Sequence, residues 1–265
     1  MNAINDHVGS VIGPVNAGGA PVFEMDGQSA PENRMEFAGE RKSAAGLRNG
    51  KTEVLARIVS RRISKRPKRM LVVGCGSGLE AAILAQEFRA QTTGIDLKAD
   101  FDPACAEHAT LQQGDATDLQ FADESFDLVY SYHALEHIPR YRTALSEMRR
   151  VLAEDGHYCV GTPNRLRLIG YLGSKDTSLA QKFLWNANDW SARLRGRFRN
   201  EYGAHAGFSP EELSTELGNV FSSVDDTTLQ YYLEVYPGKT RLIDFVCRAG
   251  IQRFLFPSAY FIGRR

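Results

Sequence analysis

The chain of 265 residues lacks several features that would set it apart from ordinary globular proteins. Its four cysteines are scattered without any C-x-x-C spacing, which excludes a disulfide framework or zinc knuckle and predicts reduced thiols. Basic and acidic residues both number 32, so overall charge argues against nucleic acid as a partner. No apolar run is long enough to cross a bilayer, and no signal-peptide pattern opens the chain. We therefore expect a cytoplasmic protein.

The order of apolar and polar segments predicts the fold class. Residues 1–33 are rich in Gly, Ala, Pro, Asn and Ser, which indicates a flexible arm, or a lid that orders over a ligand. Over residues 34–265 we expect one α/β domain with a doubly wound, mostly parallel sheet, because short apolar strands alternate with helical patterns. The expected strands contain "MLVV", "TTGIDL", "ATLQQ", "FDLVYSY" and "HYCVGTPN".

Two further segments complete this expectation. In "YRTALSEMRRVLAEDG" apolar residues recur at the three-and-four spacing of a buried helical stripe, and Gly156 is expected to end that helix. In "FSPEELSTEL" Ser209 caps a helix that Pro210 opens, with Glu212 at its third position. The tail "RFLFPSAYFIGRR" predicts a closing antiparallel strand at the sheet edge.

A glycine-rich turn links the first strand to its helix. It consists of Gly74, Cys75, Gly76, Ser77 and Gly78. Such a turn lets a ligand approach the main chain and meet the N–H groups at the start of a helix. Many glycine clusters are simply tight turns, so the turn alone is weak support for a binding site.

Two carboxylates make the turn more specific. Asp96 ends the second strand about 20 residues after the turn, where it can accept both hydroxyls of a ribose. Asp115 follows the third strand and can accept a hydrogen bond from an adenine amino group. A nicotinamide dinucleotide fits less well, because the last glycine of its fingerprint is Leu79 here. A ligand with adenosine and no phosphates is favoured, and S-adenosylmethionine is such a ligand.

The motifs "LVVGCGSG", "GIDL", "GDATDLQFADESFDLVYS", "HALEHI" and "EMRRVLAEDGHYCVGTPN" follow one another from Leu71 to Asn164. In this order they resemble class I S-adenosylmethionine-dependent methyltransferases, in the subgroup of ubiquinone-biosynthesis O-methyltransferases. The resemblance implies that the glycine turn holds the methionine moiety and that Asp96 binds the ribose. It further implies that Leu97 covers the adenine, that Asp115 and Ala116 read its edge, and that Ser131 lies beneath the methyl donor.

The string His133-Ala134-Leu135-Glu136-His137 has the H-x-x-E-H spacing of an inverted zinc-protease motif. That motif requires one uninterrupted helix, whereas here a strand ends directly before it and Pro139 follows. A protease is therefore disfavoured. The bland interpretation is that these residues cap a helix and shape the floor of a pocket.

A sharper interpretation comes from the resemblance. Some methyltransferases of this class carry Glu-x-x-Glu-His here, and a later histidine completes a metal site that grips a substrate diol. Glu136, His137 and His205 match that pattern, while His133 replaces its first glutamate. Three imidazoles and one carboxylate would favour Zn²⁺, Fe²⁺ or Mn²⁺ over Mg²⁺. Without a metal, His133 or His137 is the candidate general base for a substrate hydroxyl.

The regular alternation breaks at about residues 165–201, where arginines and lysines interleave with aromatic and aliphatic side chains. We interpret this insert as a cap over the substrate pocket. It also suits peripheral contact with an anionic membrane, since basic residues with tryptophans favour that interface. Contact of "RLRGRFR" with nucleic acid is the remaining alternative.

Together these observations predict methyl transfer from S-adenosylmethionine to an oxygen of a small hydroxylated metabolite, or of a lipid- or sugar-linked acceptor. The alternatives are N-methylation of an amine and a non-catalytic cofactor-binding protein that regulates or scaffolds a partner. The acceptor and the oligomeric state do not follow from the sequence.

Overall fold

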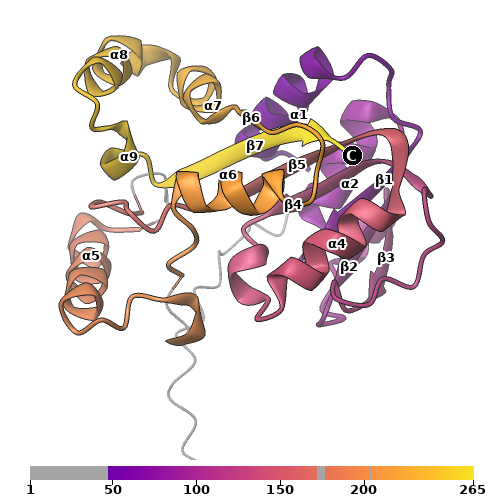
Figure 1. Ribbon diagram of the computed structural model, residues 1–265, viewed down its shortest axis with the longest axis horizontal. Helices are drawn as coiled ribbons and strands as arrows, with labels where there is room; N and C mark the ends of the chain where they lie inside the picture. Colours follow the sequence, from indigo (N-terminus) through magenta and orange to yellow (C-terminus); the bar gives the residue numbers. More distant parts are fainter. Residues whose placement is uncertain (1–46, 172–176, 203–204) are drawn as a thin grey trace, which may run out of the picture. The chain divides into compact units, whose positions relative to one another are not determined.

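The computed structural model describes residues 47–171, 177–202 and 205–265, all within one compact unit, Lys42–Arg265. The predicted arm, residues 1–33, lies outside the described residues. The unit contains a seven-stranded sheet in the order β3-β2-β1-β4-β5-β7-β6 (Figure 1). Its strands are β1 Arg69–Val73, β2 Gln91–Asp96, β3 Thr110–Gln113, β4 Phe126–Tyr132, β5 Leu152–Pro163, β6 Asp225–Asp226 and β7 Ser258–Arg264.

The first five strands pair in parallel, and β7 is antiparallel to β5. This confirms the expected doubly wound, mostly parallel α/β sheet with an antiparallel closing strand; only the two-residue β6 lies outside β7. Val73 at the end of β1 pairs with Ile95 in β2 and with Ser131 in β4. The carboxyl ends of these strands therefore meet at one edge, where α/β folds bind ligands.

Helices cover both faces of the sheet. They are α1 Gly50–Arg62, α2 Leu79–Phe88, α3 Pro103–Ala106, α4 Tyr141–Val151, α5 Leu179–Leu194, α6 Pro210–Gly218, α7 Thr228–Val235, α8 Thr240–Arg248 and α9 Gln252–Leu255. Alternate residues of β1 point to opposite faces, as strand geometry requires. Val72 packs in a cluster with α1, α2 and α7, whereas Leu71 packs in one with α4 and α6. The sheet therefore separates two hydrophobic cores, one on each of its faces.

Helix α4 shows the predicted buried stripe, since Ala144, Leu145 and Met148 are fully buried. The expectation that it continues to Gly156 is wrong. The helix ends at Val151, because Leu152 already pairs with Phe126 of β4 and begins β5.

The helix expected from Ser209 is confirmed. The Ser209 hydroxyl accepts from the Glu212 amide, and the Glu212 carboxylate accepts from the Ser209 amide in return. The insert at 165–201, where the regular alternation of the sequence breaks, contains the 16-residue helix α5. Its first turn is capped by the Ser178 hydroxyl, which accepts from the Gln181 amide.

The start of β7 pairs with β5 on one side, and on the other side it is held by α7 in place of a strand. The Tyr232 hydroxyl accepts from the Ser258 amide at 3.0 Å and donates to the Ser258 carbonyl. The Thr228 hydroxyl accepts from the Tyr260 amide at 2.9 Å. These side chains satisfy backbone groups at the sheet edge and fix the position of Ser258.

Candidate active site

The glycine turn between β1 and α2 requires its glycines for steric reasons. Gly74, Gly76 and Gly78 all have positive φ, which other residues adopt only at a cost. A Cβ on Gly74 would lie 2.3 Å from the Ala134 Cβ, and one on Gly78 would lie 2.4 Å from a Leu111 methyl carbon. The turn therefore lies directly against the segments that follow β4 and begin β3.

The other two residues of the turn differ in exposure. Ser77 is exposed, and its carbonyl accepts from the Asp102 amide at 2.9 Å. Cys75 is buried, and burial raises the pKa of its thiol to about 12, so it stays protonated and acts in packing. Both the Gly74 and the Cys75 amides donate to the Ile95 carbonyl at 2.9 Å, which ties the turn to β2.

Asp96 at the end of β2 is bonded to the turn itself. One carboxylate oxygen accepts from the Gly76 amide at 2.9 Å, and the other accepts from the Lys98 amide at 3.1 Å. A carboxylate offers about four acceptor positions, so two remain for a ligand. Beside it, the apolar side chain of Leu97 is 62% exposed, as it would be on a surface that awaits an apolar or aromatic group.

Asp115 lies in the turn after β3. One of its oxygens accepts from both the amide and the hydroxyl of Thr117, each at 2.8 Å. These hydrogen bonds lower the pKa of the Asp115 carboxyl and keep it ionised. Arg140 in turn donates to the Thr117 hydroxyl, and Ala116 is buried beneath the turn.

Ser131 lies at the end of β4, next to β1. Its side chain is buried, and its hydroxyl oxygen has no hydrogen-bond partner among the described residues. A buried polar group of this kind is rare in folded proteins. The glycine turn, Asp96, Asp115 and Ser131 thus lie at the carboxyl ends of neighbouring parallel strands, and their role as a shared cofactor site stays a prediction.

The segment after β4 does not form the long helix of a zinc protease. His133 has a left-handed backbone (φ 52°), and only the short 3-10 turn Leu135–His137 follows. This turn directs Glu136 inward, so that its side chain is buried while that of His137 is half-exposed.

Glu136, His137 and His205 come together in space. One donor atom from each lies within 4.8 Å of the others, and the two imidazole rings meet edge to face at 4.6 Å. Burial raises the pKa of Glu136 to about 8, and neither of its oxygens has a hydrogen-bond partner in the described ranges. Burial lowers the pKa of both histidines, which favours the neutral imidazole that binds metals. This arrangement fits a metal cation, because a cation would satisfy the carboxylate.

His133 does not belong to this cluster, so the four residues predicted as metal ligands do not all come together. Its ring stacks on Tyr132 at 4.3 Å, and its Nε2 lies 3.2 Å from the Ser258 hydroxyl. The left-handed backbone at residue 133 turns the ring toward β7. Burial lowers its pKa to about 3, so it remains neutral.

Arg167 organises the residues around His205, and no sequence signal identified it. Its guanidinium is buried, pairs with Asp189 of α5 at 3.2 Å and donates to the His205 carbonyl at 2.9 Å. It also donates to the carbonyls of Asn164 and Ala206 at 3.2 Å. Arg167 therefore attaches the predicted insert to the segment that carries His205, together with Arg165 and Asn200, which are hydrogen-bonded to Gly207.

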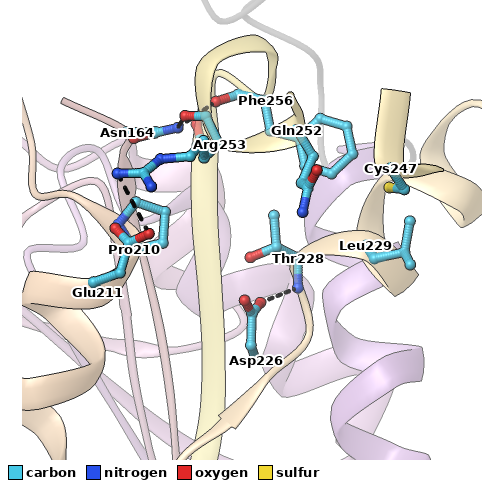
Figure 2. Close-up of a pocket in the computed structure, with 11 residues that line it drawn as sticks. Asn164, Pro210, Glu211, Asp226, Thr228, Leu229, Cys247, Gln252, Arg253 and Phe256 are labelled. Carbon is cyan, nitrogen blue, oxygen red and sulfur yellow. Dashed lines mark hydrogen bonds and ion pairs between the residues drawn. The ribbon is translucent and has the colours of Figure 1, made fainter. Parts of the chain in front are cut away.

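A pocket of about 340 Å³ lies beyond β7, between the starts of α6 and α7 and helix α9 (Figure 2). In this view Arg253 and Glu211 point toward each other from one side, while Gln252 points toward Thr228. Ser258 lines the pocket and is hydrogen-bonded to His133, so it connects the pocket wall with the segment after β4. The sequence did not predict this pocket.

Comparison with known proteins assigns the chain to a family. Residues 71–160 match the model of a methyltransferase domain. Trans-aconitate 2-methyltransferase of Deinococcus radiodurans is 30% identical over 196 residues, which cover 72% of each chain. Fatty-acid O-methyltransferase of Mycolicibacterium smegmatis is 40% identical over 97 residues, 34% of this chain and 35% of the relative. The match spans about a third of the length of several such relatives.

The fold is also similar to that of solved methyltransferases. Haemonchus contortus phosphoethanolamine N-methyltransferase 2, solved with S-adenosyl-L-methionine, superposes with a TM-score of 0.51 at 17% identity, over 80% of this chain and 52% of that chain. The chain belongs to the S-adenosylmethionine-dependent methyltransferase family. Its cofactor class is therefore S-adenosylmethionine, as the glycine turn and the resemblance predicted.

Proposed function

We propose that the protein transfers the methyl group of S-adenosylmethionine to an oxygen of a small hydroxylated acceptor, including acceptors that carry a lipid or a sugar. Two relatives support an oxygen acceptor by name, the fatty-acid O-methyltransferase and an Aspergillus sclerotiorum O-methyltransferase. The observation that carries the proposal is the bond of Asp96 to the Gly76 amide. This hydrogen bond joins the carboxylate that would bind the ribose to the turn that would hold the methionine moiety.

Within this proposal each residue has one task. The glycine turn, with Cys75 and Ser77, holds the methionine moiety, and Asp96 accepts from the ribose hydroxyls. The exposed Leu97 covers one face of the adenine, while Asp115 and Ala116 read its edge. Ser131, whose hydroxyl has no other partner in the described part of the chain, lies beneath the methyl donor.

Methyl transfer needs little chemical assistance from the protein. The acceptor oxygen forms a bond to the methyl carbon as the carbon–sulfur bond breaks, and its electrons return to the sulfur. The acceptor proton leaves to a base, and the thioether product remains. Because the sulfonium is already activated, catalysis is mainly in-line positioning of the acceptor.

We further propose that Glu136, His137 and His205 hold a divalent metal ion. Two neutral imidazoles and one carboxylate suit Zn²⁺, Fe²⁺ or Mn²⁺ better than Mg²⁺. When bound, such an ion would orient acceptor oxygens and favour their ionised form. In its absence His137 is the better candidate base, because the Nε2 of His133 is already engaged by Ser258.

Calorimetry tests the cofactor site. Replacing Asp96 with Ala removes two charge-assisted hydrogen bonds of about 1.5 kcal/mol or more each, so affinity for S-adenosylmethionine should fall at least about a hundredfold. Asp118→Ala, at an exposed carboxylate of the neighbouring turn, is the control. Equal affinity in wild type and Asp96→Ala would contradict the assignment.

Turnover and metal content test the remaining claims. Methylation of a hydroxylated acceptor supports the proposal; methylation of amines alone, or cofactor binding without any turnover, would replace it with N-methylation or a regulatory role. Elemental analysis should find about one transition metal per chain, and His205→Ala should lose it. If purified protein with added Zn²⁺ or Mn²⁺ retains none after desalting, the metal site is refuted.

A further inference from the structure

Helix α5 exposes a line of large apolar side chains. They recur at helical spacing along one side: Leu179, Phe183, Trp190 and Leu194. Leu179 is 84% exposed, Phe183 66% and Leu194 91%. The neighbouring side of the helix is the one that packs, because Asn186 is bonded to Gly170 and Asp189 to Arg167. The exposed line is therefore a surface that the described fold does not use.

A second exposed apolar surface lies on α8 and α9. Ile243 and Val246 of α8 are buried, but Leu242 and Phe245 on its other side are 58% and 65% exposed. Phe254 of α9 is also exposed. A helix that is apolar on both sides but packs on only one has a side available to an apolar partner.

Hydrogen bonds join these two surfaces. The Trp190 indole donates to the Leu168 carbonyl at 2.7 Å, and the Leu168 amide donates to the Phe254 carbonyl at 2.7 Å. Leu168 and Trp190 are themselves exposed. In Figure 1, α5, α9 and α8 follow one another beyond the start of β7. We call the exposed apolar side chains of α5, Leu168, α9 and α8 the apolar face.

Positive charge accompanies the apolar face. Residues 177–201 and 239–254 together contain nine basic and three acidic residues, in a chain whose total charge is zero. Arg195, Arg197 and Arg199, just after α5, are exposed and make no ion pair in the described part of the chain. A second copy of this chain would bring these like charges together, which disfavours self-association through this surface.

We infer that the apolar face and its basic residues bind the surface of an anionic lipid bilayer, with the apolar side chains at the depth of the headgroups. Such helices combine an apolar side with a lysine- and arginine-rich one and lie in the plane of the interface. Basic residues near an anionic surface strengthen such binding. None of the described helices is long and apolar enough to span a bilayer, so contact would be peripheral. This inference does not depend on methyl transfer.

Co-sedimentation with vesicles tests the inference on the full-length chain. The protein should bind vesicles of phosphatidylcholine with phosphatidylglycerol, and bind pure phosphatidylcholine at least about tenfold more weakly. Trp190 fluorescence should shift to shorter wavelength on binding. The double variant Arg195→Glu and Arg197→Glu should lose at least about tenfold in vesicle affinity, and high salt should have the same effect on wild type.

Matched variants distinguish vesicle binding through the apolar face from a general effect of charge and from unfolding. Lys68→Glu with Arg149→Glu makes the same charge change at exposed sites away from the apolar face and should leave vesicle binding intact. Phe183→Ser with Leu194→Ser should reduce binding at least about tenfold, whereas Phe183→Trp should retain it. Thermal unfolding confirms that each variant is folded.

Three outcomes would overturn the inference. They are equal binding to neutral and anionic vesicles, equal losses in the two charge-reversal variants, and no vesicle binding by wild type. If wild type shows no vesicle binding but sediments as a dimer that Phe183→Ser with Leu194→Ser dissociates, the apolar face is instead an interface between copies.

Discussion

The chain from β1 to β5 and the chain from β5 to β7 differ in how far the apolar side chains of their helices are buried. In the first part, helices α2 and α4 bury residues such as Leu84 and Leu145 completely. In the second part, α5 leaves Phe183 and Leu194 exposed and is held by polar contacts, chiefly Arg167 with Asp189. The comparison teaches that both halves contribute to the two cores, the second through α6, α7 and α8. Helix α5 alone depends on a few hydrogen bonds and keeps apolar surface for contacts outside the fold.

The largest loss of stability should follow from breaking the polar contacts that attach α5. Arg167→Ala leaves the partly buried Asp189 without its positively charged partner, with only the Tyr171 hydroxyl donating to it, and removes the donor to the His205 carbonyl. We expect a loss of about 3–5 kcal/mol in the free energy of unfolding, measured by urea denaturation. Arg195→Ala, an exposed arginine after the same helix, should change it by less than about 0.5 kcal/mol. Similar values for the two variants would contradict the contrast between the halves.

Truncating an apolar side chain should lower the free energy of unfolding strongly in the first half and hardly at all on α5. Leu145→Ala creates a cavity beneath α4 and should cost about 3 kcal/mol. The same truncation at Leu194, which is 91% exposed, should stay within about 0.5 kcal/mol of wild type. Thermal and urea unfolding measure both. A large loss at Leu194 would show that its side chain is covered in solution.

Glycine substitutions give a smaller version of the same contrast. Gly78→Ala strains a left-handed residue and brings its Cβ within 2.4 Å of Leu111, so about 2 kcal/mol should be lost. Gly196, after α5, also has positive φ, but an added Cβ would meet nothing within 4 Å. Alanine there should cost about 1 kcal/mol. Equal losses in urea unfolding would show that Leu111 moves freely aside.

The smallest effect concerns pH. Hydrogen bonds from Arg150, and then from the Leu119 amide, lower the pKa of Glu147 in the folded protein. Because the pKa of Glu147 is lower in the folded than in the unfolded protein, its ionised carboxylate stabilises the fold at pH values above the unfolded-state pKa. This stabilisation is lost as the pH falls through the folded-state pKa. Glu147→Gln should therefore cost about 1 kcal/mol at pH 7 and progressively less toward acid. A difference that stays constant down to pH 3, measured by urea unfolding, would contradict this account.

The sequence predicted the first half well because its signals are local. Short apolar runs ended at glycine or aspartate, and the stripe through Ala144, Leu145 and Met148 matched burial. The meeting of the glycine turn with Asp96 and Asp115 followed from parallel strands, whose carboxyl ends share an edge.

The second half was less predictable because its signals are misleading or distant. The exposed Phe183 and Trp190 of α5 blur the usual contrast between a buried and a solvated face, so the helix was missed. The sign of φ at His133 decides that its ring faces Ser258, 125 residues away, rather than Glu136. Likewise, the burial of Arg167 depends on carbonyls that only the folded chain brings near it.

Arg167 also links α5 to the segment that carries His205. The same nitrogen donates to Asp189 on α5 and to the backbone of His205. A partner that displaces α5 must either carry the backbone of His205 with it or break one of these bonds. If binding of a partner moved α5, the backbone at His205 would respond, and the resulting coupling free energy would act equally in both directions.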